Sequence, residues 1–234
     1  MDRHRLRGDR RGPPEHPWSR YALARVLSTI DDLSRVDGAR GLQLRPTGPD
    51  LASMCSGWAS LAAEPDAEEA LVDLAPWAVG RLAQLAEIEK SVLIACEGES
   101  LVHGDLRSDT MLLSDGRVYL LDWPYASRGA AWLDLALFLP GLGTQGIVGE
   151  LDGVTAGSSP EHRRAVGREL ARMFEAHPLG ATVHPADVRA VVAGVAGYLV
   201  SSALEPPLPG VPHLREVQRA QSVAATAWLE QLGI

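Results

Sequence analysis

Residues 101–123 of this 234-residue chain read LVHGDLRSDTMLLSDGRVYLLDW, and this stretch decides the fold. Two apolar runs, residues 111–113 and 118–121, flank the dipeptide Asp115-Gly116. An Asp-Gly pair between apolar runs is the strongest short-range signal for a β-hairpin. We therefore predict two antiparallel strands joined by a two-residue turn.

A two-residue turn determines which residues of the two strands face each other. Counting outward from the tip, Thr110 faces Leu121 and Asp109 faces Asp122. Directly opposed residues in an antiparallel pair have Cβ atoms about 5 Å apart. The pairing therefore brings the loop that follows Asp105 beside Asp122, whereas a slip of one residue would change which side chains meet.

Asp105 and Asp122 have the chemistry that phosphoryl transfer requires. A carboxylate must accept or orient the proton of the attacking hydroxyl, and oxygen ligands must hold Mg²⁺ against the nucleotide phosphates. Asp105 fits the first requirement and Asp122 fits the second. The alternative interpretation is that both are aspartates that stabilise turns or helix ends.

The order of these motifs resembles that of a known family. The segment from His103 to Trp123 is similar to the HGDxxxxN…DW signature of the aminoglycoside phosphotransferase family, and GAAWLDLALFLP at 129–140 is similar to its continuation. The resemblance extends from about residue 18 to the C-terminus. It implies a protein-kinase-like α+β fold and a kinase that uses Mg²⁺ and ATP or GTP.

The resemblance also implies roles for individual residues. Asp105 corresponds to the catalytic base and Asp122 to the Mg²⁺ ligand. His103 corresponds to a structural loop histidine, and Asp134 to an aspartate that braces the catalytic loop. Arg107 lies where it can approach a phosphate of the nucleotide, the alternative being a solvated surface arginine.

The chain departs from the family in two respects. Thr110 stands where the family has a metal-binding asparagine; a threonine hydroxyl also binds Mg²⁺ in P-loop proteins, with a different geometry and a shorter reach. Ahead of Asp105 there is no Gly-rich strand–loop–strand, and the only lysine, Lys90, falls in an expected helix rather than in a strand. We therefore expect the N-terminal β lobe of a kinase to be absent.

The chain divides into two expected regions. Residues 1–17 form a basic, proline-rich segment that we expect to be mobile, and residues 18–234 form a kinase-like C-terminal lobe, mostly α-helical with one catalytic β-hairpin. The GLGTQG stretch at 141–146 matches a phosphate-binding pattern, but it follows an expected helix end, so we expect only a loop there. The apolar spacing predicts helices that begin near residues 19, 76, 132, 160, 185 and 214. Pro140 is expected to end the helix that begins near residue 132.

The composition argues against several classes of protein. Lys and Arg total 22 against 30 Asp and Glu, and the formal net charge of −8 argues against binding of nucleic acid through its phosphates. Cys55 and Cys96 belong to no CxxC or His/Cys cluster, which argues against a disulfide framework or a zinc site. The N-terminus has no apolar signal region, and the longest apolar run, residues 190–200, is too short to span a bilayer. We expect a cytoplasmic protein with no membrane partner.

Two classes of function remain. The first is an ATP- or GTP-dependent phosphotransferase that acts on a small molecule with a hydroxyl group, with Asp105 as base. The second is a catalytically defective kinase-like remnant, or a truncated gene product, that acts as a binding module. In either case we expect the surface normally covered by the other lobe to expose apolar groups and to favour self-association.

Overall fold

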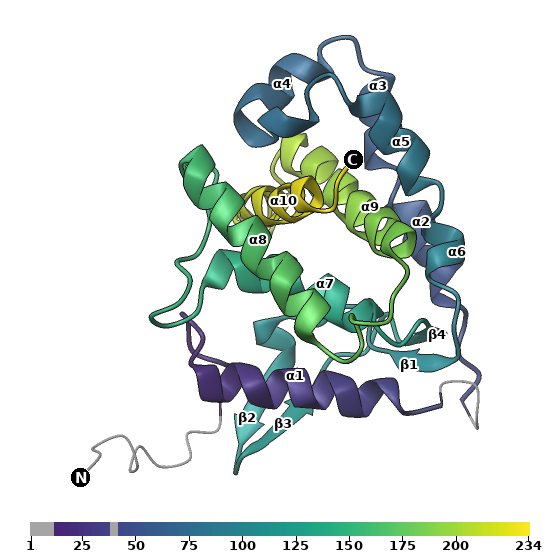
Figure 1. The fold of residues 1–234 in the computed structure, drawn as a ribbon, viewed down its shortest axis with the longest axis vertical. Coiled ribbons are helices and arrows are strands. Elements are labelled where there is room, and N and C mark those ends of the chain that lie inside the picture. Colours follow the sequence, from purple (N-terminus) through teal and green to yellow (C-terminus); the bar gives the residue numbers. More distant parts are fainter. Residues whose placement is uncertain (1–11, 38–41) are drawn as a thin grey trace.

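Helices make up most of the structure. The computed structural model describes residues 12–37 and 42–234, and this part of the chain contains ten α-helices. Figure 1 shows α9 and α10 packed together in the middle of the molecule, with α8 beside α10, and with α3 and α5 beside α9. In chain order the helices are α1 (Arg20–Ser34), α2 (Thr47–Met54), α3 (Gly57–Ala62), α4 (Ala67–Leu74), α5 (Leu82–Glu89), α6 (Val92–Ala95), α7 (Leu133–Gln145), α8 (Pro160–Ala176), α9 (Pro185–Leu204) and α10 (Leu214–Gln231).

Four short strands form two separate two-stranded sheets. Strand β2 (Met111–Ser114) pairs with β3 (Arg117–Leu120), and β1 (Ser100–Val102) pairs with β4 (Ser127–Gly129), both antiparallel. The sequence predicted only the first of these pairs. Strands β1 and β4 have three residues each and lie on either side of the whole hairpin, so no local turn signal marks their pairing.

The hairpin has the register that the sequence predicted. All four facing pairs within β2 and β3 are confirmed. Asp115 and Gly116 have φ angles of 50° and 70°, the positive values that a type I′ turn requires. The backbone N–H of Leu121 donates to the carbonyl oxygen of Thr110 at 2.8 Å, which continues the pairing from the strands toward the catalytic loop.

Helices α1 and α8 begin at the residues that the sequence indicated. The Ser19 hydroxyl oxygen accepts a hydrogen bond from the backbone N–H of Ala22, and the Ser159 hydroxyl oxygen accepts one from His162. Pro160 occupies the first position of α8, where its missing N–H costs nothing. Because N-caps and first-turn prolines are local features, the sequence alone located both helix starts.

Helix α7 does not end before Pro140, and this prediction was wrong. Pro140 lies inside the helix, which continues through the GLGTQG stretch to Gln145. A proline within a helix ordinarily costs about 3 kcal/mol. Gly143 lets α7 approach its neighbours closely, since a Cβ at this position would lie 3.1 Å from side chains of both Ala224 in α10 and Leu170 in α8. We attribute the continuation of α7 to this tertiary packing, which outweighs the local penalty.

The segment between α1 and the catalytic loop contains helices that the sequence did not predict. Helices α2, α3 and α4 have only eight, six and eight residues, and none of them begins with a side-chain cap hydrogen bond. Such short helices carry little periodic signal and are stabilised mainly by packing. The helix expected near residue 76 is a single 3₁₀ turn, Pro76–Ala78, and α5 begins later, at Leu82.

Helix α9 is the most apolar helix of the central pair. Its 20 residues are long and apolar enough to cross a bilayer by length and composition, but 67% of the apolar window is buried inside the fold. A core helix of a soluble protein passes the same test. The expectation that the protein has no membrane partner therefore stays a prediction.

The N-terminal segment is described only in part. Residues 1–11 of the segment that we expected to be mobile lie outside the described residues. At Gly12 the chain pairs with the hairpin: the N–H of Gly12 donates to the carbonyl of Leu113 at 3.3 Å, and the N–H of Leu113 donates back at 2.9 Å. The lobe organisation that the kinase-like fold implies stays a prediction.

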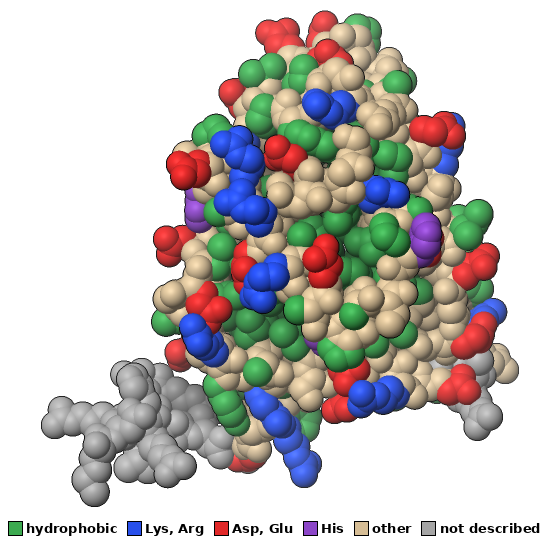
Figure 2. All heavy atoms as spheres, viewed as in Figure 1, with side chains coloured by type: hydrophobic (Ala, Val, Ile, Leu, Met, Phe, Trp, Pro, Cys, Tyr) green, Lys and Arg blue, Asp and Glu red, His purple; other side chains and the backbone are tan. Residues whose placement is uncertain are grey.

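Charged side chains of both signs are mixed over the surface. On the face drawn in Figure 2, acidic and basic side chains alternate with hydrophobic ones. On this face neither sign of charge gathers in one area. The expectation that the protein does not bind nucleic acid stays a prediction.

Candidate functional site

The loop between β1 and the hairpin holds the candidate site. His103, Gly104 and Asp105 follow β1 directly. Gly104 has a φ of 81°, which side chains rarely tolerate, and a Cβ there would lie 2.9 Å from the Cβ of Tyr125. The backbone turn that presents Asp105 therefore requires a glycine at this position.

Asp134, near the start of α7, braces this loop. Its two carboxylate oxygens accept hydrogen bonds from the backbone N–H of His103 at 2.8 Å and of Gly104 at 2.9 Å. Burial raises the pKa of Asp134 above its ordinary value, and the two hydrogen bonds act in the opposite direction because they favour the carboxylate. The brace that the family resemblance implied is confirmed.

Asp134→Asn is expected to lower the free energy of unfolding by about 1–3 kcal/mol. Asparagine has a single side-chain carbonyl oxygen, so one of the two braced N–H groups would face an NH₂ donor instead of an acceptor. Urea unfolding at neutral pH measures the change. Asp66→Asn is the matched control, because Asp66 is exposed and its side chain caps no helix. Identical unfolding curves for Asp134→Asn and the wild type would contradict the brace.

His103 links the catalytic loop to the end of the hairpin. The ring is fully buried, and its Nδ1 accepts a hydrogen bond from the N–H of Asp105 at 3.3 Å. Nε2 therefore carries the proton and donates to the carbonyl oxygen of Leu121 at 3.0 Å. The ring also lies 4.4 Å from the ring of Trp123. As the resemblance implied, this histidine is structural: it holds Asp105 near the residue that precedes Asp122.

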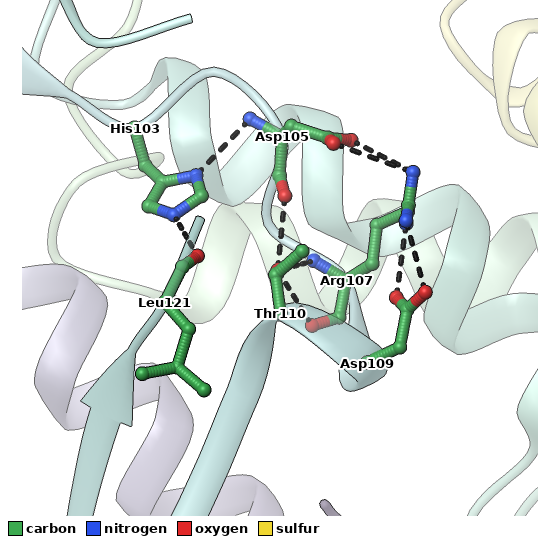
Figure 3. Close-up of polar contacts among 6 residues, drawn as sticks. All are labelled: His103, Asp105, Arg107, Asp109, Thr110 and Leu121. Carbon is green, nitrogen blue, oxygen red and sulfur yellow. Dashed lines mark hydrogen bonds and ion pairs between the residues drawn. The ribbon is translucent and has the colours of Figure 1, made fainter. Parts of the chain in front are cut away.

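The carboxylate of Asp105 faces a guanidinium group. Nη1 of Arg107 lies 3.3 Å from Oδ2 and 3.4 Å from Oδ1 of Asp105. The same guanidinium donates from Nε and Nη2 to the two carboxylate oxygens of Asp109, at 3.0 and 2.9 Å. Figure 3 shows Arg107 between the two carboxylates. Arg107 thus forms ion pairs within the loop, and its contact with a phosphate stays a prediction.

Opposing charges act on Asp105. Burial raises the pKa of Asp105, the positive charge of Arg107 lowers it, and the carboxylates of Asp109 and Asp122 raise it. The hairpin brings Leu121, the residue before Asp122, to the ring of His103, and Asp122 thus follows directly on a residue that contacts this loop. That Asp105 and Asp122 act together in one site stays a prediction.

Asp122 has an unusual backbone conformation. Its φ is 59°, in the left-handed region that Asp and Asn enter more readily than other residues with side chains. The residue is exposed, directly after the hairpin. Strained backbone of this kind concentrates at functional sites, where the surrounding structure holds it in place.

The hydroxyl of Thr110 points into the loop. Its Oγ1 accepts a hydrogen bond from the N–H of Arg107 at 3.0 Å and lies 3.0 Å from the carbonyl oxygens of both Asp105 and Arg107. Thr110 is also buried. These contacts assign the hydroxyl to holding the loop in its turn, as Figure 3 shows, and a role in metal binding stays a prediction.

Asp109 is the site residue whose role the sequence analysis missed. The hairpin register predicts only that Asp109 faces Asp122, but the strand pairing extends no further than Met111 and Leu120. The carboxylate of Asp109 binds Arg107 instead, and this hydrogen bond lowers the pKa of Asp109. The alternation of charge at residues 105, 107 and 109 is the signal that indicates such pairs.

Comparison with known proteins identifies the family. A search of curated proteins finds no match. Among solved structures, a glucosamine kinase (crystal form B) is 18% identical with a TM-score of 0.33; the alignment covers 90% of this chain and 47% of that chain, so this chain spans about half its length. Similarity at this TM-score supports no further conclusion. The model of the phosphotransferase enzyme family (APH) matches residues 5–166, a range that includes the catalytic loop, the hairpin and Asp134. The chain belongs to this phosphotransferase enzyme family.

Proposed function

We propose that this chain carries the catalytic loop of a phosphotransferase that moves the terminal phosphoryl group of ATP or GTP to a hydroxyl of a small molecule. Asp105 is the catalytic base and Asp122 is the Mg²⁺ ligand. The acceptor is a diffusible molecule in the cytoplasm. The observation that supports the proposal is the way the loop is held. Asp134 accepts hydrogen bonds from the loop backbone just before Asp105, and the ring of His103 joins the N–H of Asp105 to the carbonyl oxygen of Leu121, the residue before Asp122.

The donor set at this site is compatible with Mg²⁺. Mg²⁺ usually keeps several waters and binds one or two carboxylates together with substrate phosphates. Residues 12–37 and 42–234 contain no group of three or more His, Cys, Asp or Glu side chains that could hold a metal, so a fully protein-built cage is not the arrangement here. The exposed carboxylate of Asp122, with Asp105 nearby, suits a metal held jointly with a nucleotide. When bound, Mg²⁺ neutralises charge on the phosphate oxygens.

The residues of the loop have separate roles in the proposed reaction. Asp105 accepts the proton of the acceptor hydroxyl, which requires its carboxylate to be ionised. Arg107 favours that ionised form and, through Asp109, is itself held in place. Asp134 and His103 hold the backbone N–H groups of residues 103–105, on the N-terminal side of the Asp105 side chain, so that the base is positioned before the substrate arrives.

Three observations favour a second candidate, a non-catalytic binding module. Arg107 already pairs with Asp105, and the Thr110 hydroxyl is engaged within the loop instead of facing outward. Leu121, Trp123 and Tyr125 are exposed beside Asp122 and offer an apolar surface for a partner or a second copy of the chain.

A direct assay separates the two candidates. Residues 1–234 are purified and incubated with Mg²⁺, ATP or GTP, and a panel of aminoglycosides, other amino sugars, choline and homoserine. Turnover near 1 s⁻¹, about the low end for kinases, on any acceptor supports the phosphotransferase. Nucleotide binding without transfer to any acceptor favours the binding module. Phosphate on the acceptor is detected by ³¹P NMR, so that simple nucleotide hydrolysis is not counted.

A further inference from the structure

Two hydrogen bonds connect Trp18, which precedes α1, to the loop that carries Asp105 through one side chain. The indole Nε1 of Trp18 donates to Oε1 of Gln145 at 2.7 Å, and Nε2 of Gln145 donates to Oγ of Ser108 at 2.9 Å. Gln145 is the last residue of α7, in the GLGTQG stretch. The three residues are far apart in sequence, and the proposed function gives none of them a role.

Trp18 is a firm anchor for this connection. Its side chain is fully buried, and its ring meets Phe138 of α7 edge-on at 5.7 Å. Its backbone is held on both sides: the N–H donates to the carbonyl of Gly146 at 2.9 Å, and the carbonyl accepts from Val148 at 2.9 Å. Trp18 and the end of α7 therefore form one packed unit.

Ser108 lies at the centre of the catalytic loop. It follows Arg107, which pairs with Asp105, and begins the 3₁₀ turn Ser108–Thr110 that leads into β2. A contact at Ser108 therefore restrains the backbone next to Arg107, the residue whose guanidinium pairs with Asp105. The Asp134 brace acts on the other side of Asp105, at His103 and Gly104.

The chemistry of the three side chains determines which group donates and which accepts in the two hydrogen bonds. An indole N–H can only donate, so the side-chain amide of Gln145 must present its oxygen to Trp18. Its NH₂ group is then directed to Ser108, whose hydroxyl oxygen accepts. A glutamine suits this position because it supplies an acceptor at one end and a donor at the other.

We propose that Gln145 is a positioning residue for the catalytic loop and that it couples Trp18 to Asp105. The coupling makes the order of the loop depend on how Trp18 is seated against α7. Its effect on catalysis rests on the proposed function, whereas its effect on loop order does not.

The experiment measures amide hydrogen exchange by NMR in the full 234-residue chain. Gln145→Met keeps the length of the side chain and removes both hydrogen bonds, and Trp18→Phe keeps an aromatic ring and removes the first. Thr144→Val is the matched control, because the Thr144 hydroxyl donates to Gly141 within α7 and does not reach the loop. Exchange of the Arg107 N–H is expected to become about five- to tenfold faster in Gln145→Met and in Trp18→Phe, as for loss of one or two ordinary hydrogen bonds.

Two internal comparisons distinguish coupling from general loosening. The N–H of His103, which Asp134 holds, is expected to exchange at the wild-type rate in every variant, whereas global destabilisation would accelerate it as well. In the Gln145→Met background, Trp18→Phe is expected to raise the exchange rate of the Arg107 N–H by less than about twofold further, because both hydrogen bonds of residue 145 are already lost. Unchanged exchange at Arg107 in Gln145→Met, or a full effect of Trp18→Phe in that background, overturns the proposal.

Kinetics provide the functional readout. In an active chain, Gln145→Met is expected to lower kcat about five- to tenfold, with the KM for the nucleotide within about twofold, because the loop positions the base and not the nucleotide. Equal changes in kcat and KM would overturn the positioning role. If the wild-type chain has no turnover on any acceptor, the phosphotransferase proposal fails, and the exchange at Arg107 alone decides the coupling.

Discussion

Asp105→Asn is expected to reduce turnover by at least about 100-fold. The amide keeps the size of the carboxylate but cannot accept the proton of the acceptor hydroxyl. The loop backbone should survive the change, because the brace from Asp134 binds the N–H groups of His103 and Gly104 and not the side chain of residue 105.

The measurement is kcat with the best acceptor from the panel, alongside urea unfolding of the same sample. Asp152→Asn is the control, since Asp152 is exposed and lies in the segment between α7 and α8. Turnover of Asp105→Asn within about threefold of the wild type, with an unchanged unfolding midpoint, would remove Asp105 from the role of base.

The sequence predicted those parts of the fold whose causes are local. Asp115-Gly116 specified the turn, and the turn specified the register of β2 and β3 because a two-residue loop fixes which residues of the two strands are paired. Ser19 and Ser159 marked helix starts because a cap acts on residues within the first turn.

The parts that were missed depend on distant packing. Helix α7 continues beyond Pro140 because it packs closely against α8 and α10, which a local rule for proline does not include. The short helices α2, α3 and α4 lack capping side chains, and β1 and β4 pair across the whole hairpin. In each case the stabilising partner lies far away in the sequence.

The same distinction between local causes and distant contacts applies to the candidate site. That Asp105 and Asp122 share a site is a prediction from the hairpin, a local feature, together with a family pattern. The direction of the Thr110 hydroxyl into the loop did not follow, since it depends on the carbonyl oxygens that the folded turn presents. The contact of Gln145 with Ser108 could not be predicted either, because it joins the end of a helix to a loop and the two residues are 37 positions apart in the sequence.

Asp122→Asn is expected to weaken Mg²⁺-dependent nucleotide binding by about two to three powers of ten, because it removes the main anionic ligand of the metal. Asparagine is the appropriate replacement here. Residue 122 has a φ of 59°, a left-handed conformation that Asn adopts at least as readily as Asp, so the substitution changes the charge without adding backbone strain. Alanine at this position would combine both effects.

Calorimetry with a non-hydrolysable nucleotide, with and without Mg²⁺, measures the effect. The part of the affinity that depends on Mg²⁺ should disappear in Asp122→Asn, while the affinity measured in the presence of a chelator should stay the same. Asp66→Asn carries the same change in charge at an exposed position away from the loop and should bind as the wild type does. If Asp122→Asn keeps the full Mg²⁺ dependence, the metal is held by other groups. Asp105 would then be the first carboxylate to test, because its charge already interacts with that of Asp122.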